Sequence, residues 1–341
     1  MTRAARAGSI GRVLIDGRLR DGLEHVAEDA RICEEIGYDG AWNSENKADG
    51  FLPITLAAEH TQRLQVGSSV AIAFSRSPMT VAYQAIDLAR YSHGRFVLGL
   101  GSQIRPHITR RFSMPWSKPA ARMKDFVAAL RAIWAAWETG ERLHHRSEFY
   151  EHTLMTPNFA PPENPYGPPT VYLAAVGPHM LRTTAEVADG LFTHPFCTER
   201  YLREVIVPEV AAHRPAGAAP LEIALSAFVA LDEPDVEAVR RQISFYGSTP
   251  AYKPVLDLHG WGDLQADLNT LSKRGRWDEM VPLVTDEVLH AMCSVGTEQE
   301  VAADLHRRYG QLAHRIRFNR PGDTAGPGRF AGLVEALRSL G

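Results

Sequence analysis

The chain has 341 residues, of which 45% are hydrophobic, so it is long enough to bury a full core. It exceeds the ~250 residues typical of one α/β barrel by enough for a substantial insertion, and we expect a single domain over 1–341. A net charge of −3 and a pI near 6.5 argue against the basic surface that nucleic acid or an anionic membrane requires.

The sequence gives no sign of export, disulfides or a bound metal. It contains no run of ~18 apolar residues, and its basic N-terminus leads into no apolar segment, so we expect a cytoplasmic protein. Cys33, Cys197 and Cys293 are odd in number and widely spaced, which fits neither a disulfide framework nor a metal pair. The histidines of 140–170 match no metal-binding pattern, and we predict no metal.

Short apolar runs alternate with helical patterns along the chain, which favours a parallel sheet with its ligand site at the carboxyl ends of the strands. The predicted strands lie, in order, in 13–15, 39–46, 64–73, 95–103, the start of 171–180, 190–195, 221–231 and 314–319. Pro78 and Pro178 suit the first turns of helices, and Thr297 suits an N-cap. Eight strands and their helices can be counted.

Two segments interrupt this alternation, and we expect both to be insertions. Residues 140–170 combine histidines with a Pro-rich run, and residues 247–292 show helical patterns without a barrel strand. The second insertion is expected near the carboxyl ends of the strands, as a lid or a subunit contact.

Several groups with useful chemistry are predicted near those carboxyl ends. Asp16, His107 and His194 are ionisable candidates for proton transfer. At 176–180 a strand meets a helix with Pro at its first position, which leaves the amides of Gly177, His179 and Met180 free for an anion. An ordinary glycine-containing turn would have the same pattern. The two glycines of Gly99-Leu100-Gly101 would let a ligand approach the backbone closely, or they would only relieve crowding against a neighbouring strand.

A family resemblance covers most of the chain, about 13 to 318. It is carried by GYDGAWNSEN, VGSSVAIAFSRSP, GRFVLGLGSQ, VYLAAVGP and VADGLF, in this order. These stretches resemble the luciferase-like monooxygenase superfamily, and within it the oxidoreductases that use the deazaflavin coenzyme F420. The resemblance implies a (β/α)8 TIM barrel of the bacterial luciferase type, with F420 at the carboxyl-end rim. It also implies a homodimer, for which the Trp134 and Trp137 face is the candidate interface.

The resemblance also assigns residues to the F420 site. It implies a non-proline cis peptide at Ser69-Val70, in a bulge that continues to Ala71 and supports the deazaflavin ring. Glu45 matches the acidic residue at the polar edge of the ring, and Asn46 matches its substrate-side neighbour. The other matched positions are Ser102 and Gln103, beside the ring or the ribityl chain, and Val176, Gly177 and Pro178 with the adjoining His179, at the phosphate.

The chain also departs from part of this family. Ile104 stands where the sugar-phosphate dehydrogenases of this branch have Glu, and Asn46 stands where they often have His. These two differences put the sugar-phosphate reaction in doubt. We expect a more apolar substrate pocket instead. Arg105, Arg110 and Arg111 would suit an acidic substrate or the polyglutamate tail of the coenzyme, although a solvated loop would contain them too.

The function that the resemblance implies is hydride transfer between C5 of the deazaflavin and a carbon of a small organic substrate. One alternative is an FMN-dependent monooxygenase, which would need oxygen and a reductase partner. A second alternative is a non-catalytic flavin-binding barrel.

Overall fold

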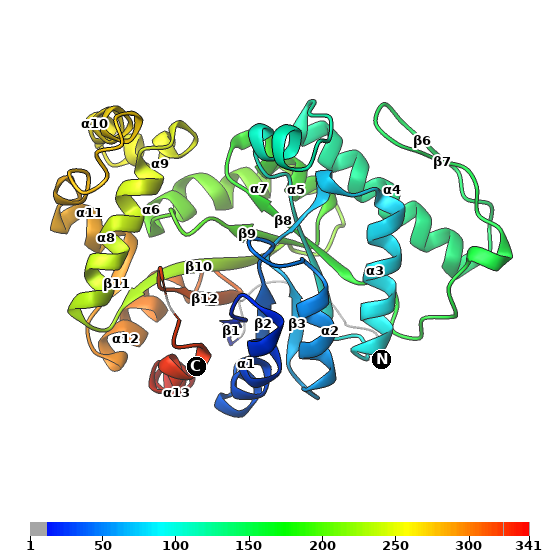
Figure 1. Cartoon of the computed structure of the whole chain (residues 1–341), viewed down its shortest axis with the longest axis horizontal. Helices are drawn as coiled ribbons and strands as arrows, with labels where there is room; N and C mark the ends of the chain where they lie inside the picture. Colours follow the sequence, from blue (N-terminus) through cyan, green and yellow to red (C-terminus); the bar gives the residue numbers. More distant parts are fainter. Residues whose placement is uncertain (1–11, 323, 341) are drawn as a thin grey trace.

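The computed structural model describes residues 12–322 and 324–340, and its centre is a closed parallel barrel (Figure 1). The barrel strands are β1 (Leu14–Arg18), β2 (Gly40–Asn43), β3 (Gln65–Ser68), β5 (Phe96–Gly101), β8 (Thr170–Ala175), β9 (Gly190–Thr193), β10 (Glu222–Ala230) and β12 (Arg315–Asn319). The sheet closes because β12 pairs with both β1 and β10. The predicted (β/α)8 barrel is confirmed.

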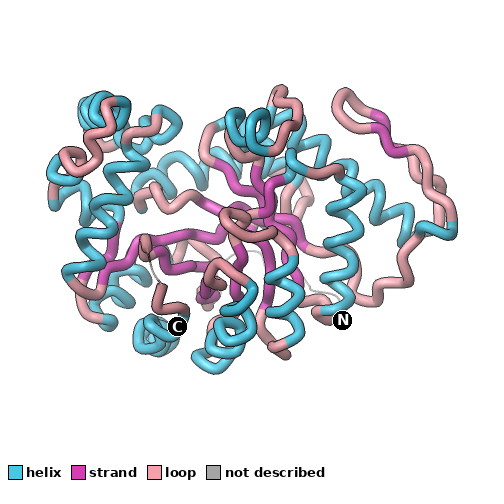
Figure 2. Tube along the Cα trace, in the orientation of Figure 1, coloured by secondary structure: helices cyan, strands magenta, loops and turns pink. Residues whose placement is uncertain are grey.

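The helices lie outside the strands, as Figure 2 shows in cyan around magenta. They are α1 (Leu23–Ile36), α2 (Leu52–Glu59), α3 (Pro78–Tyr91), α4 (Pro119–Thr139), α5 (Pro178–Val187), α6 (Glu199–Tyr201), α7 (Val207–His213), α8 (Glu233–Gly247), α9 (Lys253–Leu258), α10 (Gly262–Lys273), α11 (Asp286–Met292), α12 (Glu298–Tyr309) and α13 (Ala331–Leu340). Shorter helical turns are η1 (Ala73–Ser75), η2 (His107–Arg111), η3 (Pro157–Phe159), η4 (Leu202–Ile206), η5 (Pro250–Tyr252), η6 (Val281–Leu283) and η7 (Pro327–Phe330).

Local sequence signals explain several helix boundaries. Pro78 opens α3 and Pro178 opens α5, where the missing amide proton of proline costs no helical hydrogen bond. Thr297 caps α12 in a capping box, because its side chain accepts from the Glu300 amide while the Glu300 carboxylate accepts from the Thr297 amide. These predicted starts are confirmed.

The strand predicted over 64–73 is divided in two. The strand β3 ends at Ser68, the peptide bond between Ser69 and Val70 is cis as the resemblance implies, and β4 (Ala71–Ile72) resumes the pairing with β5. Beside this segment, a Cβ at Gly99 would lie 1.9 Å from the Ser68 carbonyl oxygen, and one at Gly101 would lie 2.6 Å from Val70. Strand crowding therefore explains both glycines.

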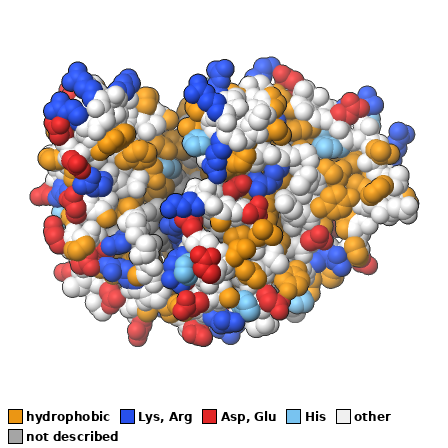
Figure 3. All heavy atoms as spheres, viewed as in Figure 1, with side chains coloured by type: hydrophobic (Ala, Val, Ile, Leu, Met, Phe, Trp, Pro, Cys, Tyr) orange, Lys and Arg blue, Asp and Glu red, His pale blue; other side chains and the backbone are white. Residues whose placement is uncertain are grey.

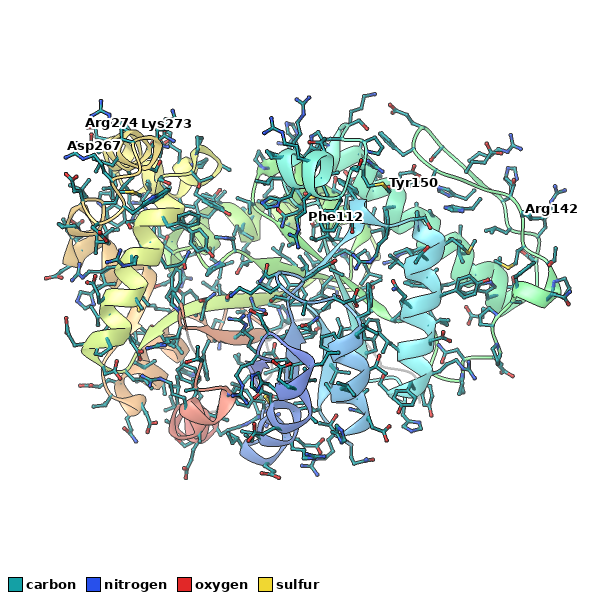
Figure 4. The ribbon with its side chains drawn as sticks, in the orientation of Figure 1. Phe112, Arg142, Tyr150, Asp267, Lys273 and Arg274 are labelled. Carbon is teal, nitrogen blue, oxygen red and sulfur yellow. The ribbon has the colours of Figure 1, made fainter. Side chains whose placement is uncertain are left out.

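The two expected insertions lie at opposite ends of the molecule in Figure 1. The first contains a hairpin of β6 (His145–Arg146) and β7 (Glu151–His152), which the sequence pattern did not predict. The second carries α9, α10 and α11, and Figure 4 shows Asp267, Lys273 and Arg274 on the outer side of α10. After it, β11 (Cys293–Val295) adds an unexpected strand beside β10.

The tryptophans of α4 pack within the subunit. Trp134 is buried and donates its indole N–H to the Ala82 carbonyl of α3 at 3.2 Å. The Trp137 ring lies 4.7 Å from the Tyr83 ring. The expectation that this face forms a dimer interface is therefore wrong for Trp134, because α3 already covers it.

The barrel interior has its own small core beneath the carboxyl-end rim. It consists of Trp42, Val97, Tyr172, Phe192 and Ala224, with Val70 and Ala174 packed on it. These side chains fill the barrel interior beneath the rim. No helix of the described residues has the length and apolar character needed to cross a membrane. Figure 3 shows charges of both signs interspersed over one face, without a continuous basic surface.

Candidate active site

A cavity of about 550 Å³ opens above this inner core, at the carboxyl ends of the strands. The strands β1, β2, β5, β8, β9 and β12, or the loops after them, supply most of its walls together with the Ser69-Val70 segment after β3, while α8 and η5 close one side. The sequence-predicted residues that line it are Asp16, Glu45, Asn46, Ser69, Val70, Ser102, Gln103, Val176 and His194. Those that do not line it are Ala71, His107, Gly177, Pro178 and His179. His107 lies exposed on η2, so the structure does not bring it to the other candidates.

Glu45 is held in place on both oxygens. Its carboxylate accepts from two nitrogens of the Arg76 guanidinium, each at 2.8 Å, and from the Ile72 amide at 2.6 Å. A bidentate pair of this kind is strong and also holds the carboxylate in one orientation. Glu45 thereby ties the loop after β2 to the chain that follows the Ser69-Val70 bulge. Its contact with a ligand ring stays a prediction.

Asp16 is likewise engaged within the protein. Both of its oxygens accept from the buried Arg315 guanidinium, at 2.7 and 2.8 Å, and that guanidinium lies over the Trp42 ring. The paired carboxylate raises the pKa of Arg315 against the opposing effect of burial. Asp16 is therefore part of the cavity floor in a structural ion pair, which leaves its predicted role in proton transfer without support.

His194 lies between two tyrosines that the sequence analysis did not single out. Its ring stacks on Tyr252 at 4.4 Å and meets Tyr246 edge-on at 4.5 Å. The Nδ1 atom accepts from the Phe196 amide at 3.1 Å, so the proton of the neutral ring is on Nε2 and is donated to the Tyr252 hydroxyl at 3.0 Å. Burial, with the nearby Arg317 charge, lowers the pKa of His194 to about 3, so the ring is neutral at physiological pH.

The remaining predicted residues form the outer wall. Asn46 is exposed, and its carbonyl accepts from Arg111 of η2 at 2.9 Å. The Ser102 hydroxyl donates to the Gln103 carbonyl at 3.1 Å, and Gln103 has a φ of 57°. These contacts order the loop after β5 beside the cavity.

The predicted anion turn lies at the cavity edge, directly after Val176. Gly177 is the N-cap of α5, and the amides of Gly177 and His179 make no hydrogen bond with the described residues. The Met180 amide donates to the Gly177 carbonyl at 3.1 Å, so the expectation that it is free is wrong. A Cβ at Gly177 would meet no atom within 4 Å, which leaves this helix end open to a ligand.

The cavity also contains residues that the sequence reasoning missed. Tyr246, Tyr252, Arg317 and Asn319 all line it, and the expectation of a pocket more apolar than that of the sugar-phosphate dehydrogenases stays a prediction. A signal existed for Arg317, because Arg315 and Arg317 alternate along a strand and therefore point to the same face. No signal marked Tyr252, which lies in the second insertion.

The chain has relatives over nearly all of its length. An uncharacterised protein of Mycobacterium tuberculosis is 47% identical over 318 residues, covering 91% of this chain and 94% of the relative. The 5,10-methylenetetrahydromethanopterin reductase of Methanolobus tindarius is 25% identical over 295 residues, covering 84% and 87%.

Solved structures share the fold at lower identity. A coenzyme F420-dependent tetrahydromethanopterin reductase from Methanopyrus kandleri superposes with a TM-score of 0.75 at 18% identity, covering 96% of this chain and 98% of the other. An F420-dependent secondary alcohol dehydrogenase gives a TM-score of 0.72 at 17% identity, covering 96% and 100%. EDTA monooxygenase from Chelativorans gives 0.71 at 16% identity, covering 97% and 94%. The family model described as luciferase-like monooxygenase matches residues 6–315, and the chain belongs to that family.

Proposed function

We propose that this protein is an F420-dependent oxidoreductase that transfers a hydride between the deazaflavin and a small organic substrate. The main support is the single cavity wall in which Glu45, the Ser69-Val70 bulge, Ser102 and Val176 come together from separate strands. These are the positions that the resemblance assigns to F420. A reductase and an alcohol dehydrogenase that are both named as F420-dependent share the fold, which is compatible with the same cofactor.

The residues present fit such a cofactor. The open N-terminus of α5 would take the phosphate, since the free amides of Gly177 and His179 lie at the positive end of the helix dipole. Ser69, Val70 and Glu45 would hold the ring, with Ser102 and Gln103 along its side. F420 bound there supplies two-electron hydride chemistry at C5.

Within this proposal, Tyr252 is the hydrogen-bond donor to the substrate. Its oxygen accepts from His194 Nε2, so its own O–H is available to an acceptor atom in the cavity. Burial raises the pKa of Tyr252 to about 12, so the hydroxyl keeps its proton at physiological pH. His194 acts as a positioning residue that orients this hydroxyl and exchanges no proton itself.

A titration of the purified protein with F420, and separately with FMN, tests the proposal. Trp42 is a built-in fluorescence reporter, because its ring lies 5.3 Å from Phe192, which lines the cavity. Tight F420 binding with weak FMN binding is the expected result. The reverse would favour the alternative of a reduced-flavin monooxygenase; a monooxygenase, EDTA monooxygenase, also shares the fold of this chain. Binding of neither would overturn the proposal.

Two further expectations accompany this function. We propose that the protein acts in the cytoplasm and that it is a homodimer. The face that mediates the dimer must lie elsewhere than on Trp134, which is buried within the subunit. The mass in size-exclusion chromatography with light scattering tests the oligomeric state.

A further inference from the structure

Arg317 is a cationic side chain of the cavity that has no carboxylate partner among the described residues. Arg317 projects from β12, where its backbone is in register with Asp16 of β1 and Ser226 of β10. Its guanidinium donates to the hydroxyls of Ser69 at 2.9 Å and Ser226 at 3.4 Å. No carboxylate among residues 12–322 and 324–340 forms an ion pair with it.

The surroundings do not neutralise this charge. Both oxygens of Asp16, the nearby acid, are taken by Arg315. The other cavity-lining arginines have their own acidic partners: Arg18 with Asp21, Arg20 with Asp29, and Arg320 with Asp235. Hydroxyl groups satisfy hydrogen bonds but carry no negative charge, so Arg317 has no ion-pair partner among the described residues, and the nearby Asp16 offsets only part of the cost of its burial.

Burial, together with repulsion from Arg18, lowers the pKa of Arg317 to about 10. The group remains charged at physiological pH. A desolvated cation that faces a cavity attracts an anion more strongly than one in water, because the local dielectric is low. A guanidinium also presents the planar donors that carboxylates and phosphates accept.

We propose that Arg317 binds an anionic group of the substrate, a carboxylate or a phosphate, where its guanidinium faces the cavity beside Ser69. This deepens the proposed function, on which it rests for the identity of the site. The position suits catalysis, since Arg317 acts electrostatically on both His194 and Tyr246, and His194 in turn holds Tyr252. A substrate anchored there would therefore have its neighbouring atoms close to the Tyr252 hydroxyl.

The test compares thermal unfolding of the cofactor-free full chain with and without small anions. The probes are inorganic phosphate in one arm and acetate and succinate in the other, each titrated in a zwitterionic buffer. The variants are Arg317→Met, which removes the charge, and Arg317→Lys, which keeps it. Ser226→Ala is the matched control, because it removes one hydrogen bond of Arg317 and leaves the cation intact.

We expect a saturable rise of Tm with one class of probe in the wild type and in Ser226→Ala. The same anion should bind roughly tenfold to a hundredfold more weakly to Arg317→Met, with Arg317→Lys between the two. Without anion, Arg317→Met should melt above the wild type, because it removes a buried charge that has no ion-pair partner of its own. A purely structural role for Arg317 predicts the opposite, namely a lower Tm.

Equal anion effects in the wild type and Arg317→Met would overturn the proposal, as would no saturable effect of any probe on the wild type. If Arg317→Met fails to fold, an unchanged anion affinity in Arg317→Gln would overturn it as well. F420 titrations of the same proteins separate the two proposals. If anion binding depends on Arg317 but F420 does not bind, the anion site stands and the F420 function is removed. If F420 binds but anion binding does not depend on Arg317, the F420 function stands and the anion site is removed.

Discussion

At the scale of single residues, the cavity differs from a generic barrel rim through the pairing of His194 with Tyr252. The imidazole is fixed on one side by the Phe196 amide and on the other by the phenol, so its tautomer is determined by its hydrogen bonds. As a consequence, the Tyr252 hydroxyl keeps its proton available for a ligand in the cavity that it lines.

Replacing Tyr252 by Phe should lower kcat by about a hundredfold, in the range for loss of one positioned proton donor. F420 affinity should be unchanged, and His194→Gln should show a smaller loss of kcat. Steady-state kinetics with a substrate found by screening provide the measurement. Tyr246→Phe is the matched control, since its ring also contacts His194 while its hydroxyl forms no hydrogen bond with the described residues. Equal losses in the two phenylalanine variants would remove the assigned role of Tyr252.

His194 should also make folding sensitive to acid. Its pKa is about 3 in the folded protein against 6.5 for the free side chain, so below pH 6.5 the unfolded chain takes up a proton that the folded chain resists. The free energy of unfolding should fall as the pH drops from 6.5 towards 3, by up to about 1.4 kcal/mol per pH unit from this group. Urea unfolding at a series of pH values measures the slope. His194→Gln should flatten it, and parallel curves for the two proteins would contradict the prediction.

At the scale of secondary-structure elements, the N-terminus of α5 is the part of the rim most open to a charged ligand. Gly177 has a φ of −89°, which any residue can adopt, and the space around its Cβ position is free. A substitution there can therefore test ligand binding without disturbing the fold.

Gly177→Asp should fold normally and lose F420 binding, because its carboxylate would occupy the positive helix end and repel the phosphate. Gly177→Ala is the control and should bind F420 nearly as the wild type does. Fluorescence titration measures both affinities, and circular dichroism checks the fold. Wild-type affinity in Gly177→Asp would place the phosphate elsewhere.

At the scale of the whole molecule, the barrel closes where the first strand meets the last. Asp16 of β1 and Arg315 of β12 form a buried ion pair at this seam, and Arg315 also donates to Gln65 of β3 at 2.6 Å. Because the pair is desolvated, each partner depends on the other for compensation.

Asp16→Ala should lower the free energy of unfolding by about 3–5 kcal/mol, since it leaves the Arg315 charge buried and unpaired. The double variant Asp16→Leu with Arg315→Met removes both charges and should be less destabilised than the single variant. Urea denaturation of the three proteins measures the difference. A double variant that is less stable than Asp16→Ala would show that the pair contributes more than mutual compensation.

The sequence by itself determined the order of strands and helices and several of their ends. Apolar periodicity and residues such as Pro78, Pro178 and Thr297 act within a few positions along the chain, so local reading captured them. The family resemblance added the barrel, the Ser69-Val70 cis peptide and a site wall of which the larger part does line one cavity.

Only the tertiary structure decided which charges and hydroxyls share that cavity. Tyr252 meets His194 across 58 residues, and Arg317 meets Ser69 across 248, so no local pattern contains these contacts. Packing likewise buried Trp134 against α3 and left His107 exposed on η2. Periodicity assigns a side chain to a face of its own element, whereas its partners and its charge balance depend on what the closed barrel places opposite that face.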